Sequence, residues 1–387
     1  MSEIRCDILI CGGGLAGLSL LYRAMKAGVW TSENIIVVDR TEKKEHDKIW
    51  SFWKKGRIDF EEIIYHQWDN LFFFSNTGDK TGLQTRGYTY NSIRSIDFYQ
   101  YVLPYLYQFK NITFVKADVT AVSSSNGECR LVTSEQTYTA KYLFNSVYHQ
   151  PLLLKEEQYF LQHFKGWRIK TDSEIPPVSS AYLMDFRTGQ EHGTTFFYTL
   201  PMAQNELFIE YTLFTKSLLQ QEEYDDKIRI YLAEILKIDD YEKVEEEFGV
   251  IPMTDHVFKR FDDHIIYIGT AGGDTRASTG YTFMNTQKTI SKILDAYKQY
   301  GNPFFKDENT SLKHQLYDST LLNVLDKGKY KGHQLFSDLF SKSPAYFIFP
   351  FLDAEASIFQ DIQIMKSLRV MPFLKSFTQA VFRKIRG

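Results

Sequence analysis

Residues 7–39 read DILICGGGLAGLSLLYRAMKAGVWTSENIIVVD, and this stretch decides the fold of the N-terminal part of the chain. An apolar run over 7–11 predicts a buried strand, and a second apolar run over 35–38 predicts another, ending at Asp39. Between them a helical segment extends to about Lys26 and is stopped by Gly28. The order strand, glycine-rich turn, helix, strand, acid predicts a Rossmann-type βαβ unit.

The turn itself, residues 12–17, has the spacing G-x-G-x-x-G. Gly12 permits the tight turn, Gly14 lets a pyrophosphate approach the backbone, and Gly17 lets the helix pack close to the strand. The helix start at Leu15 and Ala16 presents free N–H groups and a positive dipole end to the phosphates. We therefore predict that these residues bind a dinucleotide.

Asp39 lies 22 residues after the last glycine, where a carboxylate can accept hydrogen bonds from ribose hydroxyls, and we place the adjacent Arg40 in the same site. A purely structural glycine turn is the alternative. The fingerprint stands at the extreme N-terminus, an arrangement that suits a permanently held FAD. A nicotinamide would then have no Rossmann domain of its own.

Composition narrows the class of protein. The 387 residues are 43% hydrophobic and 24% charged, which is ordinary for a soluble globular protein of two domains or two lobes. A net charge of −3 gives no general attraction to nucleic acid, and the three cysteines have neither C-x-x-C nor metal-site spacing. We expect a cytoplasmic protein without a metal, without a transmembrane span and without a signal peptide. The 31 Phe and 25 Tyr are either compositional bias or the lining of a large apolar cavity.

The order of predicted elements gives an α/β fold in four segments. Residues 1–150 form the first part of an FAD-binding domain, in which Asp97 is expected to cap a helix that ends near Phe109. Residues 151–248 alternate as an inserted antiparallel sheet, the substrate domain. Residues 249–300 return to the FAD-binding domain, with a buried strand, a glycine loop and a helix that starts near Gly280. Residues 301–387 are mostly helical.

The return segment adds four residues to the predicted cofactor site. A strand–glycine–loop–helix sequence late in a chain with one N-terminal fingerprint is how flavoproteins close around FAD. On this basis we assign Gly269, Asp274, Gly280 and Tyr281 to the cofactor.

The last 22 residues, 366–387, contain six Lys or Arg, no acid and interleaved apolar residues that include Leu368, Val370, Phe373, Leu374, Phe377, Val381, Phe382 and Ile385. Such a basic amphipathic tail can lie on an anionic bilayer surface, which predicts peripheral association with the inner membrane. An ordinary surface helix is the alternative.

The strand over 207–214 carries the strongest catalytic candidate. Its period of two places Glu210 on one face with Phe208 and Phe214, while Tyr211 points the other way. A carboxyl among aromatic rings is desolvated, which raises its pKa and lets it act as a general acid near neutral pH. An exposed glutamate on the wet face of an edge strand is the alternative. Asp185 alternates into the same sheet and is a second candidate, unless it pairs with Arg187.

Six motifs occur in order along the chain: CGGGLAGLSL, WSFW, FFYTLP, FIEYTLF, GVIPM and IGTAGGDTRASTGYTF. Together they resemble the bacterial lycopene β-cyclase family, in the form seen in flavobacteria and their relatives. The resemblance extends from the first strand to about residue 300 and more weakly to Asp353. It implies the aromatic-hydroxylase-like flavoprotein architecture.

The resemblance also implies an activity. Such enzymes are redox-neutral isomerases that close the ψ-ends of lycopene into β-ionone rings, giving γ-carotene and then β-carotene. They bind FAD, which NAD(P)H must reduce although no electrons are consumed overall. The catalytic acid of the family lies in an E-[ED]-T strand motif, whose first position is Glu210 here. The second position is Tyr211, a departure that argues against a scheme with two adjacent carboxylates.

Two other functions fit the same features. An FAD-dependent monooxygenase or prenyl reductase shares the architecture and would consume NAD(P)H stoichiometrically. A non-catalytic carotenoid-binding flavoprotein would have no reaction for Glu210 to catalyse.

Overall fold

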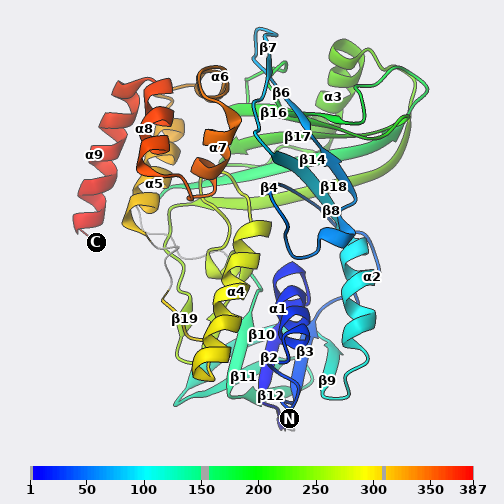
Figure 1. Cartoon of the computed structure of the whole chain (residues 1–387), viewed down its shortest axis with the longest axis vertical. Helices are drawn as coiled ribbons and strands as arrows, with labels where there is room; N and C mark the ends of the chain where they lie inside the picture. The colour runs from blue at the N-terminus through cyan, green and yellow to red at the C-terminus, as the bar shows by residue number, and fades with distance from the viewer. Residues whose placement is uncertain (1–2, 150–156, 307–310, 387) are drawn as a thin grey trace.

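The chain folds into two halves that share one boundary. The computed structural model describes residues 3–149, 157–306 and 311–386, with side chains to 382. One half is the Rossmann-type unit around the N-terminus, and the other is a large sheet with the C-terminal helices beside it (Figure 1). This is the predicted α/β architecture.

A mostly parallel sheet forms the core of the Rossmann half. The two strands predicted from the fingerprint are the fourth and fifth of its six strands, and they pair in parallel with Ile8 opposite Ile35. In sheet order the strands are β19 (Phe261–Asp262), β20 (Ile265–Tyr267), β13 (Tyr142–Asn145), β2 (Ile8–Cys11), β3 (Ile35–Asp39) and β9 (Ile112–Lys116). β2 is buried throughout, as its unbroken apolar run requires in a sheet covered on both faces. The carboxyl ends of these strands therefore point at the ligand crevice of the fold.

Two smaller sheets flank this core. One pairs the N-terminal strand with a meander, in the order β1 (Glu3–Arg5), β12 (Thr137–Ala140), β11 (Glu128–Thr133) and β10 (Val119–Ser125). The other has the order β4 (Ile49–Lys55), β8 (Tyr88–Arg94) and β5 (His66–Trp68), and it joins the two halves of the molecule.

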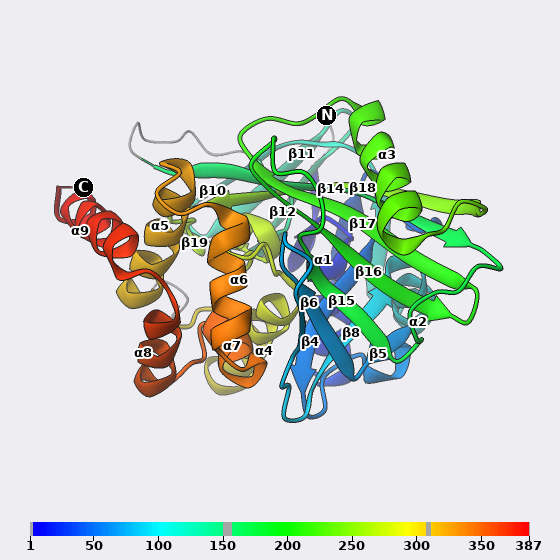
Figure 2. The same ribbon diagram turned by 90° about the horizontal axis from the view of Figure 1, so that it is seen from above.

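The second half is built on a seven-stranded sheet that is antiparallel except where β15 and β6 run parallel. Its order is β18 (Glu242–Thr254), β14 (Tyr159–Lys170), β17 (Glu206–Thr215), β16 (Thr194–Ala203), β15 (Ser180–Asp185), β6 (Asn70–Phe74) and β7 (Lys80–Gly82). Seen from above, α3 lies across one face of this sheet and the C-terminal helices gather at its side (Figure 2). Both faces of β17 are consequently buried, each against a different cluster.

The helices follow in chain order, with three short helical turns of other types. The α-helices are α1 (Leu15–Lys26), α2 (Ser95–Leu106), α3 (Gln221–Ile230), α4 (Phe283–Tyr300), α5 (Leu312–Asp326), α6 (Gly332–Lys342), α7 (Ala345–Leu352), α8 (Ile358–Ser367) and α9 (Val370–Arg386). The 3₁₀ turns are Glu61–Ile63 and Gly269–Gly272, and α3 continues as a π-helical turn, Tyr231–Leu236.

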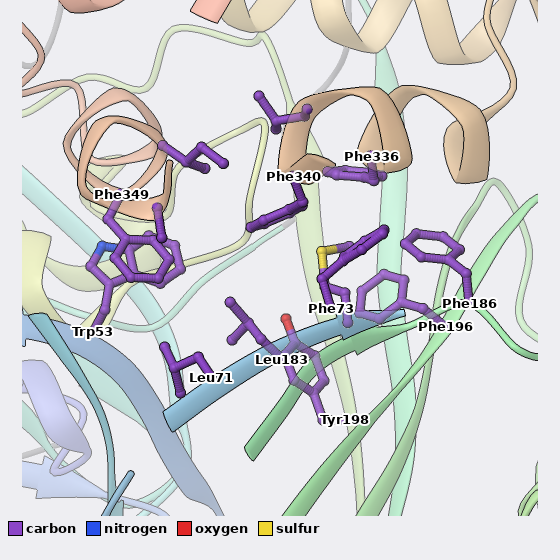
Figure 3. Packing of buried hydrophobic residues seen from close by; sticks show 14 of the residues in the cluster. Trp53, Leu71, Phe73, Leu183, Phe186, Phe196, Tyr198, Phe336, Phe340 and Phe349 are labelled. Carbon is purple, nitrogen blue, oxygen red and sulfur yellow. The ribbon is translucent and has the colours of Figure 1, made fainter. Parts of the chain in front are cut away.

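Aromatic side chains account for much of the core between the seven-stranded sheet and helices α6 and α7 (Figure 3). Phe73 stacks on Phe340 with ring centroids 5.0 Å apart, and Trp53 stacks on Phe349 at 4.8 Å. Stacked aromatic pairs of this kind add about 1 kcal/mol each beyond the area they bury. Much of the aromatic surplus is therefore packed in the core of this half of the molecule.

The structure differs from the predicted segments in three places. β6 and β7, within residues 1–150, belong to the seven-stranded sheet, and β18 extends this sheet to Thr254 rather than 248. The helix assigned to Asp97 begins two residues earlier, so Asp97 lies in its first turn and accepts hydrogen bonds from Arg94 at 2.7 Å. The boundary at 150 and 151 lies outside the described residues. Among the described residues, no helix is long and apolar enough to cross a bilayer.

Candidate active site

The turn after β2 has the shape that a dinucleotide requires. Gly12 adopts φ +98°, and a Cβ on Gly17 would lie 2.0 Å from the Gly12 carbonyl oxygen, so these two positions admit only glycine. Gly14 caps α1 without a capping side chain and has open space where its Cβ would be. The first N–H groups of α1, at Leu15 and Ala16, thus follow directly on this open space, at the end of a helix where anions bind.

Asp39 ends β3 beside this turn, as predicted. Its carboxylate accepts hydrogen bonds from the backbone N–H of Gly13 at 2.7 Å and of Thr41 at 2.8 Å, and Lys43 lies 3.3 Å away. Burial alone would raise the pKa of Asp39, but these donors and the lysine outweigh it and lower the pKa. The residue is held ionised as a hydrogen-bond acceptor. Arg40 is exposed at the end of the strand.

The return segment packs directly on this turn. Gly269 adopts φ +61°, and a Cβ there would lie 2.9 Å from the Cβ of Ala16. Asp274, however, is buried away from the crevice, where it accepts hydrogen bonds from Arg260 at 2.8 Å, from Gly269 N–H at 2.7 Å and from Thr289 at 2.7 Å. These hydrogen bonds let its carboxylate hold the loop that shapes the site, and contact between Asp274 and the cofactor stays a prediction.

A cavity lies where the two halves meet, and we call it the Glu210 cavity. The seven-stranded sheet forms one wall, and β4 with the start of α4 forms the other. It is lined by Ile49, Trp50, Ser51, Tyr90, Gln162, Phe164, Tyr198, Leu200, Phe208, Glu210, Ile251, Thr279, Gly280, Tyr281, Thr282 and Phe283. Two predicted cofactor residues, Gly280 and Tyr281, thus face the predicted acid across one space.

Glu210 is the one residue of Glu206–Phe214 that is not buried, because its side chain opens into the cavity. Phe208 and Phe214 lie on the same face within the aromatic core, as the period of two predicts. Desolvation raises the pKa of Glu210 to about 7, against a lowering effect of the hydrogen bond that Thr212 Oγ1 donates to its Oε1 at 2.8 Å. The side chain is therefore suited to carry a proton near neutral pH.

Three tyrosines surround this carboxyl. Tyr198 is directly opposite Glu210 on β16, and the Tyr281 hydroxyl lies 3.4 Å from that of Tyr198 and 3.5 Å from that of Tyr90. Burial raises the pKa of all three, so they remain neutral. Their ring faces give the cavity electron-rich walls that can stabilise a positive charge. Tyr90 and Tyr198 were not predicted as site residues, because they come from strands that are distant in sequence.

Asp185 does not join Glu210. It is fully buried on the opposite face of the sheet, where it is the cross-strand neighbour of Phe197 in the cluster covered by α3. Both of its oxygens accept hydrogen bonds from Arg187, and Tyr231 donates a further one at 2.7 Å. The catalytic assignment of Asp185 is corrected, and the alternative of a pair with Arg187 is confirmed. Tyr211 also lies on that face, as predicted.

A second carboxyl lies on the same face of the sheet as Glu210 and was not predicted from the sequence. Glu247 of β18 lies one strand beyond Gly166, which is itself opposite Glu210. Glu245, Glu247, Gly249 and Ile251 stand at every second position of this strand, and a period of two would have placed Glu247 on the same face as Ile251.

The residues of the crevice and cavity fit a flavin dinucleotide. Gly14 leaves room for a pyrophosphate, and the α4 N-terminus has no capping side chain. Gln162 Oε1 is buried in the cavity wall with no hydrogen-bond partner in the part of the chain that the structure describes. Gly280, with φ +72°, approaches this oxygen so closely that a Cβ would lie 2.1 Å from it. A bound ring system with polar edges would supply the missing partner.

Solved structures with the same fold include a flavin-dependent enzyme and a halogenase in complex with FAD. A geranylgeranyl bacteriochlorophyll reductase-like protein from Thermoplasma acidophilum aligns with a TM-score of 0.62 at 10% identity, covering 98% of this chain and 100% of that one. The flavin-dependent brominase Bmp2 aligns at 0.57 and 13% identity, covering 99% of each chain. Halogenase PltM, in complex with phloroglucinol and FAD, aligns at 0.54 and 10% identity over 90% of this chain and 79% of that one.

These likenesses confirm the predicted Rossmann-type, aromatic-hydroxylase-like architecture. A comparison with curated proteins finds no match. The family model described as lycopene cyclase protein matches residues 7–378, nearly the whole chain. The chain belongs to the lycopene cyclase family.

Proposed function

We propose that the protein is a lycopene β-cyclase that binds FAD and closes both ψ-ends of lycopene, by way of γ-carotene, to β-carotene. The observation that carries the proposal is the position of Glu210: a carboxyl with a raised pKa, in an aromatic cavity that opens towards the α4 N-terminus. Cyclisation requires a proton donor in a site that excludes water. Glu210 can carry a proton near neutral pH, and aromatic side chains surround it.

The residues that would hold the cofactor come from three parts of the chain. The α1 N-terminus with Gly14 would bind the pyrophosphate, Asp39 the ribose, and Gly280 with Gln162 the edge of the ring system. Reduced FAD, with NAD(P)H as the source of electrons, would supply negative charge next to the cation that forms during ring closure. The positive end of α4 favours that charge.

The protein's own part in the reaction is acid–base chemistry. Glu210 gives its proton to a carbon of the terminal double bond, leaving a tertiary carbocation, and the electrons of the neighbouring double bond form the ring bond. Loss of a proton from the ring then leaves the β double bond, so that one proton enters and one leaves. The rings of Tyr90, Tyr198 and Trp50 stabilise the cation by their electron-rich faces.

The substrate must come from a bilayer, because an acyclic C40 hydrocarbon does not dissolve in water. What supports a membrane-facing surface is a set of exposed apolar side chains on α8 and α9: Ile358, Phe359, Ile362, Met365, Val370, Met371, Leu374, Phe377 and Phe382. Met371, for example, is 74% exposed, and a contiguous exposed apolar surface is typical of a membrane or partner contact. With Lys366 and Lys375 close by in sequence, these helices suit peripheral binding to the anionic surface of the inner membrane from the cytoplasm.

The test is the balance of electrons in a purified reaction. The loaded enzyme is supplied with lycopene in phospholipid vesicles, and NAD(P)H consumption is measured against cyclised product. Product formation over many turnovers without matching consumption of NAD(P)H supports the cyclase. Stoichiometric consumption, or an oxidised or hydrogenated product, would instead establish a redox flavoenzyme. Vesicle binding without product would support a carotenoid-binding protein.

A further inference from the structure

Trp53 packs against the tyrosine wall of the Glu210 cavity, by which we mean Tyr90, Tyr198 and Tyr281. It is a residue of β4, and its cross-strand neighbour on β8 is Tyr90, so the two side chains share a face of the sheet. The centroid of its ring lies 4.1 Å from that of Tyr281. The hydroxyl of Tyr281 in turn lies within 3.5 Å of the other two hydroxyls. Two of the three tyrosines therefore rest directly beside one indole.

The indole of Trp53 is itself fixed from the side of the C-terminal helices. Its Nε1 donates a hydrogen bond to Oδ2 of Asp353 at 2.6 Å, and Asp353 directly follows α7. Its ring stacks on Phe349 of α7, with the ring planes only 7° apart (Figure 3). Trp53 is 3% exposed, so the loss of Asp353 would leave a buried donor without its acceptor. The carboxylate and the helix together set the position and the tilt of the ring.

Tyr281 has space to move into if the indole is released. A second, smaller cavity is lined by Phe52, Trp53, Tyr281, Phe283, Met284, Asn285 and Asp353. Tyr281 and Phe283 line both cavities and therefore form part of the wall between them. Space beside a buried ring permits it to shift, which close packing prevents elsewhere in a core. The hydrogen bond between Trp53 and Asp353 consequently restrains Tyr281 as well.

The position of the wall matters because the cation formed on ring closure can lose its proton in three ways. The positive carbon is bonded to a ring CH, to a ring CH₂ and to a methyl group. Only loss of the CH proton gives the β double bond, and the other two losses give isomeric rings. Each course releases one proton. Walls that hold the cation in a single orientation therefore select a single product, and electron-rich ring faces hold it best where the charge develops.

We propose that Asp353 is a positioning residue for cyclisation: by holding the Trp53 indole it fixes the tyrosine wall, and this wall directs the proton loss that gives the β ring. The inference rests on the proposed function, which it extends from the proton donor to the choice of product. It gives a role to the last residue of the WSFW motif, and it makes the turn after α7 part of the site.

The test compares variants of Asp353 in the full chain, loaded with FAD and supplied with lycopene in phospholipid vesicles. Asp353→Leu has a similar size and no acceptor. We expect it to lower kcat about tenfold or more with little change in KM, because small misplacements of positioning groups have effects of up to about a hundredfold. Its product should be a mixture of ring isomers. Asp353→Asn keeps an acceptor oxygen and should restore the β ring and most of the rate.

The matched control is Glu355→Gln, two residues further along the chain. Glu355 is exposed and pairs with Lys288 of α4 at 2.5 Å, so this variant removes an ion pair near Asp353. Exposed ion pairs contribute little, and the variant should keep the wild-type kcat and the β ring.

Trp53→Phe tests the same link from its other side and keeps the test open if Asp353→Leu does not fold. Phenylalanine retains a ring between Phe349 and Tyr281 but has no N–H to donate. This variant should show the same loss of kcat and the same ring isomers. The double variant should be no worse than either single one, because the two residues act as a unit.

A second readout does not depend on turnover. The indole N–H of each tryptophan gives its own signal in a proton–nitrogen correlation NMR spectrum, and the Trp53 signal is the one lost in Trp53→Phe. It should move in Asp353→Leu and stay in place in Glu355→Gln. A Trp53 signal that does not move in Asp353→Leu overturns the hydrogen bond on which the role depends.

The outcomes separate this role from the proposed function. A wild type that cyclises lycopene, while folded Asp353→Leu and Trp53→Phe keep its kcat and its β ring, overturns the positioning role alone. A wild type that forms no ring product overturns the proposed function, and the positioning role with it, even if the Trp53 signal moves as expected.

Discussion

Thr212 sets how readily Glu210 gives up its proton, and Thr212→Val isolates this effect. Thr212 is fully buried among phenyl rings, and its hydroxyl donates to Glu210 Oε1 at 2.8 Å. The bond favours the ionised carboxylate and therefore lowers the pKa of Glu210. Valine has nearly the same shape and no hydroxyl, so the substitution removes the donor and leaves the packing largely unchanged.

The size of the effect follows from the strength of one charged hydrogen bond. Hydrogen bonds to ionised groups contribute about 1.5–3 kcal/mol, and one pKa unit corresponds to about 1.4 kcal/mol. Removing the Thr212 donor should raise the pKa of Glu210 from about 7 by roughly one to two units. The protonated fraction, and with it the cyclisation rate, would then persist to a pH about one to two units higher.

The assay is the initial rate of ring formation as a function of pH in vesicles loaded with lycopene. Thr212→Ser is the control, because it keeps the hydroxyl and loses only a methyl group, and its alkaline limb should coincide with that of the wild type. A folded Thr212→Val enzyme whose limb stays in place or moves to lower pH would refute the assignment of Glu210 as the titrating acid.

Three further predictions test the surroundings of the cavity. Ionisation of Glu210 in the folded state is unfavourable, so above pH 7 the Glu210→Gln variant should be more stable than the wild type by up to about 3 kcal/mol. This difference should disappear as the pH falls towards 4.5, because the wild-type carboxyl is then protonated in the folded state. Urea unfolding above pH 7 and near pH 4.5 measures it. Gly166→Ala places a methyl group 2.5 Å from the Phe208 ring and should lower the free energy of unfolding by about 1–3 kcal/mol. The control Gly82→Ala, whose nearest neighbour is Phe72 at 3.8 Å, should lower it by less than about 1 kcal/mol. Equal losses in urea unfolding would contradict the packing of Phe208 on Gly166. Replacing exposed Met371 and Leu374 together by Glu should weaken flotation with anionic vesicles at least tenfold and leave the thermal midpoint within a few degrees, and unchanged flotation would exclude this surface.

The Rossmann half was predictable because its signals are local. The residues of the glycine turn and the two apolar runs are close in sequence, and each has a conformational reason to be where it is. Strand β17 was predictable for the same reason, since a period of two over eight residues assigns each side chain to a face. Glu210 was therefore found from its own strand.

What the sequence did not reveal depends on contacts between distant strands. Glu247 stands in an acidic run, which favours a solvated surface, and the pairing of β18 with β14 places it, partly buried, on the same face as Glu210. Asp185 could not be assigned to a face because β15 is irregularly paired, with register shifts on both sides. Asp274 follows a glycine loop, as a ligand-binding acid would, and the sequence does not show that its carboxylate forms a buried ion pair with Arg260 at 2.8 Å.

In the proposed reaction Glu210 supplies the proton for ring closure. The most direct test of this role is pigment analysis of lycopene-accumulating bacterial cells that express the wild type or Glu210→Gln, with flavin content and folding checked in both. We expect β-carotene from the wild type and unreacted lycopene from the variant. Cyclised product from a folded, flavin-loaded Glu210→Gln enzyme would contradict it.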